Sequence, residues 1–173
     1  AHLLPLTEDG EIHDSGLRNH LAYLSDVDGV SGIICNANAA EGPTLSPEER
    51  VRVLEIADDV VPTEMPIVAT TLGGSTREVV ADARRAREAG ADAVLVREPF
   101  SGIAADGDVV REFFGHLDEM LDLPIVVFQH PEQNGSSYSP DVLGDLVELA
   151  SVVGVKAAAW EVGNFERDLY AMR

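Results

Sequence analysis

Short apolar runs alternate with longer amphipathic stretches along the whole chain. The apolar runs predict six strands, at residues 3–6, 31–35, 67–71, 93–97, 125–129 and 152–156. Amphipathic periodicity predicts helices near residues 15–28, 46–60, 76–89, 108–121 and 140–150, with another that begins near Glu161. The predicted strands are continuously apolar rather than alternating, which is typical of a parallel sheet that is buried on both faces.

Local signals mark several helix ends. The segment Ser46-Pro47-Glu48-Glu49 offers an N-cap, a proline at the first helical position and a glutamate at the third. Ser139-Pro140-Asp141 repeats the cap and the proline. Gly90 follows the 76–89 stretch and predicts a helix stop.

The spacing of the strands predicts the fold. Their centres fall roughly 26–36 residues apart, which is the length of one βα unit. Regular βα units without a glycine-rich nucleotide loop favour a (β/α)8 TIM barrel over a doubly wound sheet. Such a barrel has eight strands and typically about 250 residues, whereas this chain has 173 residues. We therefore predict one α/β domain over residues 1–173 that forms about the first six βα units of a TIM barrel, truncated so that the C-terminal part is missing. An open α/β sheet is the alternative.

Composition narrows the range of partners and compartments. With 31 Asp and Glu against 12 Lys and Arg, the formal net charge is −19, so we expect no nucleic acid and no membrane as partners. No apolar run approaches a membrane span and the start lacks the basic region of a signal peptide, so we expect a cytoplasmic protein. The acidic residues are dispersed and lysine is nearly absent, which is typical of a halophile-like surface. A single cysteine, Cys35, excludes an internal disulfide.

Lysine occurs once, at Lys156, where it closes the last predicted strand. Arginine stays protonated, whereas a desolvated lysine can lose its proton and attack a carbonyl carbon. Moving the lysine pKa from about 10.4 to roughly 7–8 costs on the order of 4 kcal/mol, which burial among valines can supply. Chemistry in a TIM barrel sits where strands end, so Lys156 is a candidate Schiff-base nucleophile. The alternative is that composition bias has left one buried or snorkelling lysine.

Five segments carry motifs of one enzyme family in the family's order. The first two read Pro5-Leu6-Thr7-Glu8-Asp9-Gly10-Glu11-Ile12-His13, and Glu41 followed by Leu45-Ser46-Pro47-Glu48-Glu49-Arg50. The third is Ala89-Gly90-Ala91-Asp92-Ala93 with Pro99. The fourth, residues 123–131, resembles Leu-Pro-x-x-x-Tyr-Asn-x-Pro, and Val153-Gly154-Val155-Lys156 resembles a strand that bears a Schiff-base lysine. Over essentially its whole length, the chain is similar to the lyases and aldolases that include dihydrodipicolinate synthase and N-acetylneuraminate lyase.

The resemblance implies a class I mechanism. Lys156 would condense with the ketone of pyruvate or another 2-oxo acid, and the protonated imine would act as an electron sink while a neighbouring carbon–carbon bond forms or breaks, or while water is lost. The resemblance implies no metal and no organic cofactor. It also implies a homo-oligomer, a dimer or a tetramer, for the full-length protein.

The chain departs from the family at the loop after the second predicted strand. The family usually has Gly-Thr/Ser-Thr-Gly-Glu there, with hydroxyls that bind the substrate carboxylate and relay protons. Here residues 37–41 read Ala-Asn-Ala-Ala-Glu, so both hydroxyls are missing. Asn38 can still donate from its amide and the backbone can still bind a carboxylate, which makes Asn38 and Ala39 candidate substrate-binding residues.

Three further positions have changed. The family's proton-shuttling tyrosine aligns with Phe128, and phenylalanine transfers no proton. The interfacial tyrosine aligns with Ser101, and the arginine that grips the second substrate's carboxylate aligns with Gln133. His130 is a candidate replacement acid or base, since it shares strand parity with Phe128 and imidazole titrates near neutral pH. The alternative is a solvated histidine at the start of a loop.

These residues leave three functions open. The first is a Schiff-base lyase or aldolase that acts on a 2-oxo acid through Lys156. The second is a non-catalytic or truncated barrel that is kept for binding or assembly. The third is a true 4-hydroxy-tetrahydrodipicolinate synthase, which the altered specificity positions disfavour.

Overall fold

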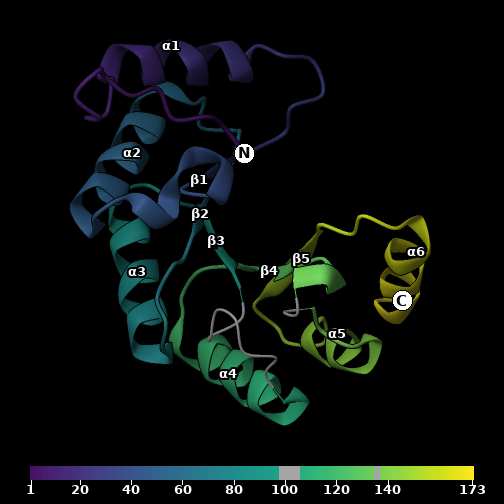
Figure 1. Cartoon of the computed structure of the whole chain (residues 1–173). Coiled ribbons are helices and arrows are strands. Elements are labelled where there is room, and N and C mark those ends of the chain that lie inside the picture. Colours follow the sequence, from purple (N-terminus) through teal and green to yellow (C-terminus); the bar gives the residue numbers. More distant parts are fainter. Residues whose placement is uncertain (98–105, 135–136) are drawn as a thin grey trace. The chain divides into compact units, whose positions relative to one another are not determined.

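Five strands alternate with six α-helices in the part of the chain that the structure describes. The structure is a computed structural model, and it describes residues 1–97, 106–134 and 137–173 (Figure 1). The position of Ser101 therefore lies outside the described residues. The strands are β1 (Ile33–Cys35), β2 (Ile67–Thr70), β3 (Ala93–Val96), β4 (Ile125–Gln129) and β5 (Val152–Ala157). The helices are α1 (Asp14–Ser25), α2 (Pro47–Val60), α3 (Thr76–Glu88), α4 (Gly107–Met120), α5 (Pro140–Leu146) and α6 (Val162–Ala171).

The strands form one sheet in the order β1-β2-β3-β4-β5, with parallel pairing of β1 with β2 and of β4 with β5. A strand order that follows the chain, with a helix after each strand, is that of a partial TIM barrel, so the predicted fold class is confirmed. The chain divides into two compact units, which are described separately below. Unit 1 comprises residues 1–72 and 82–94, and unit 2 comprises residues 73–81 and 95–173.

The strand predicted at residues 3–6 does not form. Only Leu6 makes an isolated antiparallel bridge, to Ile12. Pro5 in the middle of this run has no N–H to donate to a ladder, and the chain turns back within a few residues. Gly10, at a φ of +85°, allows that turn, in which its N–H donates to the carbonyl of Thr7.

Unit 1 places β1 and β2 against α1 and α2 over one apolar core. Ser46 caps α2 in a complete capping box, in which its hydroxyl accepts from Glu49 N at 3.2 Å and the Glu49 carboxylate accepts from Ser46 N at 2.7 Å. Pro47 stands at the first helical position as predicted. Cys35 is completely buried in this core, and burial raises the pKa of its thiol to about 12.

Unit 2 contains β4, β5 and the helices α4, α5 and α6. Four residues of α4 are buried, and one of them, Phe114, meets Tyr138 edge to face at 6.0 Å between ring centroids. Ser139 caps α5 by accepting from Val142 N. In α6 the buried residue is an acid, Asp168, where an amphipathic helix usually buries apolar side chains. Its exposed side chains include Val162, Phe165, Leu169 and Tyr170.

The prediction that every strand is buried on both faces is wrong for β5. Its residues are mostly half-buried, and Val153 is 64% exposed. In the described sheet, β5 stands last in the strand order and pairs only with β4. Lys156 therefore lies in a strand that is paired along one edge and only partly covered.

Candidate functional site

Lys156 lies across from Phe128 at the carboxyl ends of β5 and β4. The two residues are partners in the parallel register of these strands. The Lys156 Nζ atom stands over the aromatic ring of Phe128, 3.7 Å from the ring centroid. The phenylalanine at the family's tyrosine position is thus a packing partner of the amine.

Two effects act on the protonation of this amine. Partial burial removes water from the ammonium and lowers the pKa of Lys156 below its ordinary value. The negative face of the Phe128 ring attracts the ammonium and opposes that shift. The side chain is only half-buried, so the valines do not enclose it as the sequence suggested. Burial therefore lowers the pKa of Lys156, and the ring of Phe128 limits the size of that shift.

His130 joins the same group. Its ring centroid lies 4.0 Å from that of Phe128, with an angle of 40° between the two planes. The predicted shared side of Phe128 and His130 is confirmed by this contact, and His130 is 8% exposed rather than solvated. The ring of Phe128 therefore contacts both the amine of Lys156 and the imidazole of His130.

A buried polar network fixes the end of β4 beside this group. Gln129 is 1% exposed, and its Oε1 accepts from Tyr138 N at 2.9 Å. Its Nε2 donates to Tyr138 O and to Asp168 Oδ2, both at 3.0 Å. Asp168 in turn accepts hydrogen bonds from the guanidinium of Arg167. Gln129 thus ties the chain before α5, and α6 itself, to the strand that bears Phe128.

From the sequence, Gln129 was predicted only as a position in a motif. An amide at the end of the apolar run 125–129 is a signal that was available, since a buried amide needs partners for its donors and acceptor. Its acidic partner Asp168 lies 39 residues away. No local pattern identifies a partner at that distance.

Gln133 is not part of the group around Lys156. It lies on the short 3-10 helix Glu132–Asn134 with its side chain exposed. Its neighbour Glu132 forms an ion pair with Arg167 and accepts from Asn164 Nδ2 at 3.1 Å. The turn that carries Gln133 is therefore attached to α6.

In unit 1, Asn38 and Ala39 begin a 3-10 turn that spans Asn38–Ala40, and both side chains are exposed. The first N–H groups of a helical turn have no partner within that turn, which suits them to an anion. The loop is tightly closed. Glu41 adopts a left-handed φ of 55°, and a Cβ on Gly42 would lie 1.9 Å from the carbonyl oxygen of Asn36.

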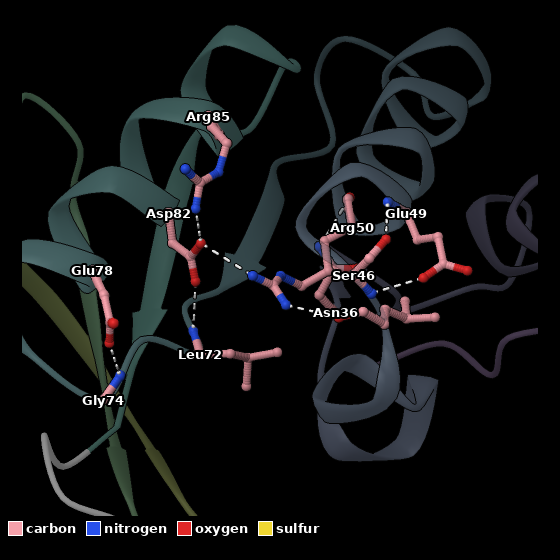
Figure 2. Close-up of polar contacts among 10 residues, drawn as sticks. Asn36, Ser46, Glu49, Arg50, Leu72, Gly74, Glu78, Asp82 and Arg85 are labelled. Carbon is pink, nitrogen blue, oxygen red and sulfur yellow. Dashed lines mark hydrogen bonds and ion pairs between the residues drawn. The ribbon is translucent and has the colours of Figure 1, made fainter.

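Unit 1 has a polar network of its own, which holds the ends of β1 and β2 (Figure 2). Asp82 of α3 accepts hydrogen bonds from Leu72 N at 3.1 Å, from Arg50 Nη2 at 3.2 Å and from Arg85 Nη2. Arg50 also donates from Nη1 to Leu45 O at 2.9 Å, and its own carbonyl accepts from Asn36 Nδ2 at 3.2 Å. Arg50 belongs to the second motif of the sequence, from which no role was predicted for it.

Two kinds of site are not seen in the described part of the chain. Within residues 1–97, 106–134 and 137–173, no three His, Cys, Asp or Glu side chains gather as metal ligands. No helix that the structure describes is long and apolar enough to cross a membrane.

Comparisons with known proteins agree with this architecture. Residues 1–172 match the model of the dihydrodipicolinate synthetase family. The 4-hydroxy-tetrahydrodipicolinate synthase of Methanothrix thermoacetophila is 33% identical over 167 residues, which cover 96% of this chain and 55% of that protein. The enzyme of the same name from Gluconacetobacter diazotrophicus is 31% identical over 173 residues and is covered to 57%. The chain thus spans about half the length of these curated relatives.

Solved structures show the same relation. CdNal of Clostridium difficile, solved in complex with mannosamine, superposes with a TM-score of 0.85 at 28% identity, over 96% of this chain and 57% of that one. A dihydrodipicolinate synthase of Bacillus anthracis superposes with a TM-score of 0.90 over 100% of this chain and 59% of that one. At 24% identity, the second likeness shows the fold alone.

Proposed function

Because the chain belongs to the dihydrodipicolinate synthetase family, we propose that it is a class I lyase or aldolase that forms a Schiff base between Lys156 and pyruvate or another 2-oxo acid. The observation that carries this proposal is the setting of Lys156. It is the only lysine of the chain, it stands at the carboxyl end of a sheet strand, and partial burial lowers its pKa.

The proposed chemistry begins with the neutral amine. Its lone pair attacks the ketone carbon of the 2-oxo acid and forms a carbinolamine, which then loses water to give the imine. Protonation of the imine nitrogen makes it an electron sink for the neighbouring carbon–carbon bond. A lowered Lys156 pKa raises the fraction of amine that can make the first attack at neutral pH.

Proton transfer needs a group other than Phe128. A phenyl ring carries no exchangeable proton, although it can hold the amine in place. We assign the acid and base role to His130, whose ring contacts the same phenylalanine and whose imidazole can both donate and accept a proton. In this proposal, His130 protonates the departing hydroxyl of the carbinolamine and later accepts a proton.

The remaining substrate contacts rest on the family resemblance. By that resemblance, Asn38 and Ala39 are candidates for binding a substrate carboxylate, since the N–H groups that begin their turn have no partner within it. Gln133 would hydrogen-bond the second substrate without neutralising a charge, because its amide replaces a guanidinium. A substrate with a neutral group at that position suits this chain better than one with a second carboxylate.

The test is reductive trapping. The protein is incubated with pyruvate or a panel of 2-oxo acids, reduced with borohydride, and weighed intact by mass spectrometry. Because the chain has one lysine, peptide mapping needs only to separate Lys156 from the amino terminus. An adduct on Lys156 that is lost in Lys156→Arg is the expected result. An adduct at the amino terminus alone would refute the proposal.

One observation favours a second candidate, a non-catalytic chain kept for binding or assembly. Phenylalanine replaces the family's proton-relay tyrosine at position 128. Binding of a 2-oxo acid without any trapped adduct would support this candidate. Formation of the product of 4-hydroxy-tetrahydrodipicolinate synthases would instead support the third function left open by the sequence.

A further inference from the structure

A small, partly open cavity with polar groups in its wall lies in unit 1 beside the carboxyl ends of β1 and β2. Asn36, Arg50, Thr70 and Asp82 supply polar groups to its wall, and apolar side chains of α2 and α3 close part of the remainder. Its volume is about 20 Å³. One water molecule needs at least roughly 10–15 Å³, so the cavity has the size of a single water.

Two buried oxygen atoms in this wall need a hydrogen-bond partner. Asn36 Oδ1 and Thr70 Oγ1 have none among the described residues, and their side chains belong to residues that are 2% and 6% exposed. Both residues follow a pair in the sheet register, because Cys35 pairs with Ala69, Asn36 comes directly after β1 and Thr70 is the last residue of β2. A buried polar atom without a hydrogen-bond partner is destabilising, so a ligand that satisfies both atoms is favoured.

The orientation of the Asn36 amide follows from its other contact. Its Nδ2 faces the carbonyl oxygen of Arg50 at 3.2 Å. A carbonyl oxygen only accepts hydrogen bonds, so the amide nitrogen belongs on that side and Oδ1 belongs on the other. The group that Asn36 offers to the cavity is therefore an acceptor.

Charge and donor type decide the class of ligand. Arg50 and Arg85 contribute two positive charges to the wall against one negative charge from Asp82, which disfavours a cation. An anion is disfavoured because Asn36 Oδ1 offers it no proton. A water molecule can donate to one oxygen and either donate to or accept from the Thr70 hydroxyl.

We propose that this cavity is a binding site for one internal water molecule, hydrogen-bonded to Asn36 Oδ1 and Thr70 Oγ1. The water extends the hydrogen-bond network that joins Asn36, Arg50 and Asp82. Asn36 begins the loop after β1 and Leu72 lies in the loop after β2, so these hydrogen bonds hold both loops to α2 and α3. The site does not depend on the proposed enzymatic function.

Crystal structures of the whole chain and of two Thr70 variants test the site. In the unaltered protein and in Thr70→Ser, we expect a solvent peak within roughly 2.7–3.2 Å of both the residue-70 hydroxyl and Asn36 Oδ1. In Thr70→Val, which keeps the shape and removes the hydroxyl, we expect the peak to be lost. The serine variant is the control for a general effect of substitution at this buried position.

Three outcomes would overturn the proposal. The first is a cavity without a solvent peak in the unaltered protein, and the second is a peak that persists unchanged in Thr70→Val. The third is an anomalous signal that identifies an ion in the cavity when crystals are soaked in bromide or rubidium salts. In solution, a nuclear Overhauser effect between water and the Thr70 methyl group is expected in the unaltered protein. Its absence would count equally against the site.

Discussion

The contact between Lys156 and Phe128 makes a quantitative prediction about the pKa of the amine. A cation–π attraction at a half-buried site is worth about 1 kcal/mol, which corresponds to about 0.7 of a pKa unit. The ring stabilises the protonated form, so its removal makes the proton easier to lose. Leucine keeps most of the bulk that shields the amine from water. We therefore expect Phe128→Leu to lower the Lys156 pKa by about half a unit to one unit.

The single lysine makes this pKa directly measurable. Reductive methylation with ¹³C-formaldehyde labels only Lys156 and the terminal amine, and NMR titration of the labelled methyl groups follows each pKa separately. Phe128→Tyr is the matched control, because it keeps an aromatic face under the amine and should leave the pKa in place. An unchanged or raised pKa in Phe128→Leu would show that the ring acts by shielding the amine from water rather than by attracting its charge.

Three other predictions concern stability. Asp82→Asn should lower the free energy of unfolding by about 1–3 kcal/mol, whereas Asp59→Asn, at an exposed ion pair, should lower it by less than about 1 kcal/mol. Urea denaturation of both variants tests this difference, and equal costs would contradict it. Gly90 and Gly29 both have a left-handed φ, but a Cβ on Gly90 would lie 2.4 Å from the carboxyl carbon of Asp58 and one on Gly29 would meet no atom within 4 Å. Gly29→Ala should therefore cost about 1–2 kcal/mol and Gly90→Ala clearly more, again by urea denaturation, and the reverse order would be inconsistent with the clash. If the net charge of −19 reflects a halophile-like surface, Tm should rise as KCl approaches molar concentrations, and a Tm that is indifferent to salt would argue against that origin.

Local chemistry made parts of the fold predictable. Ser46 and Ser139 cap helices where their sequence context placed them, since capping depends on residues within one turn. Gly90 ends α3 for the same reason, because its φ of +95° is open to glycine without strain. The predicted strand at 3–6 failed, because an apolar run that contains a proline has no partner specified by the run itself.

The candidate site was predictable only where it depends on strand geometry. Parity along β4 placed Phe128 and His130 on one side, and the structure brings their rings into contact. The burial of Lys156 was overestimated, because the exposure of a strand depends on the segments that pack against it and not on its own apolar run. The link between Gln129 and Asp168 was missed, because it joins residues that are distant in the sequence.

The buried acid of α6 has a consequence for how that helix is attached. A helix that is attached only by apolar side chains can shift slightly, because one methyl group can replace another against a core. Asp168 must instead meet the amide of Gln129 on β4 at a defined angle, and a rotation of the helix by one residue, about 100°, would carry its carboxylate away from that amide. A single acidic side chain thus sets the rotational position of the whole helix.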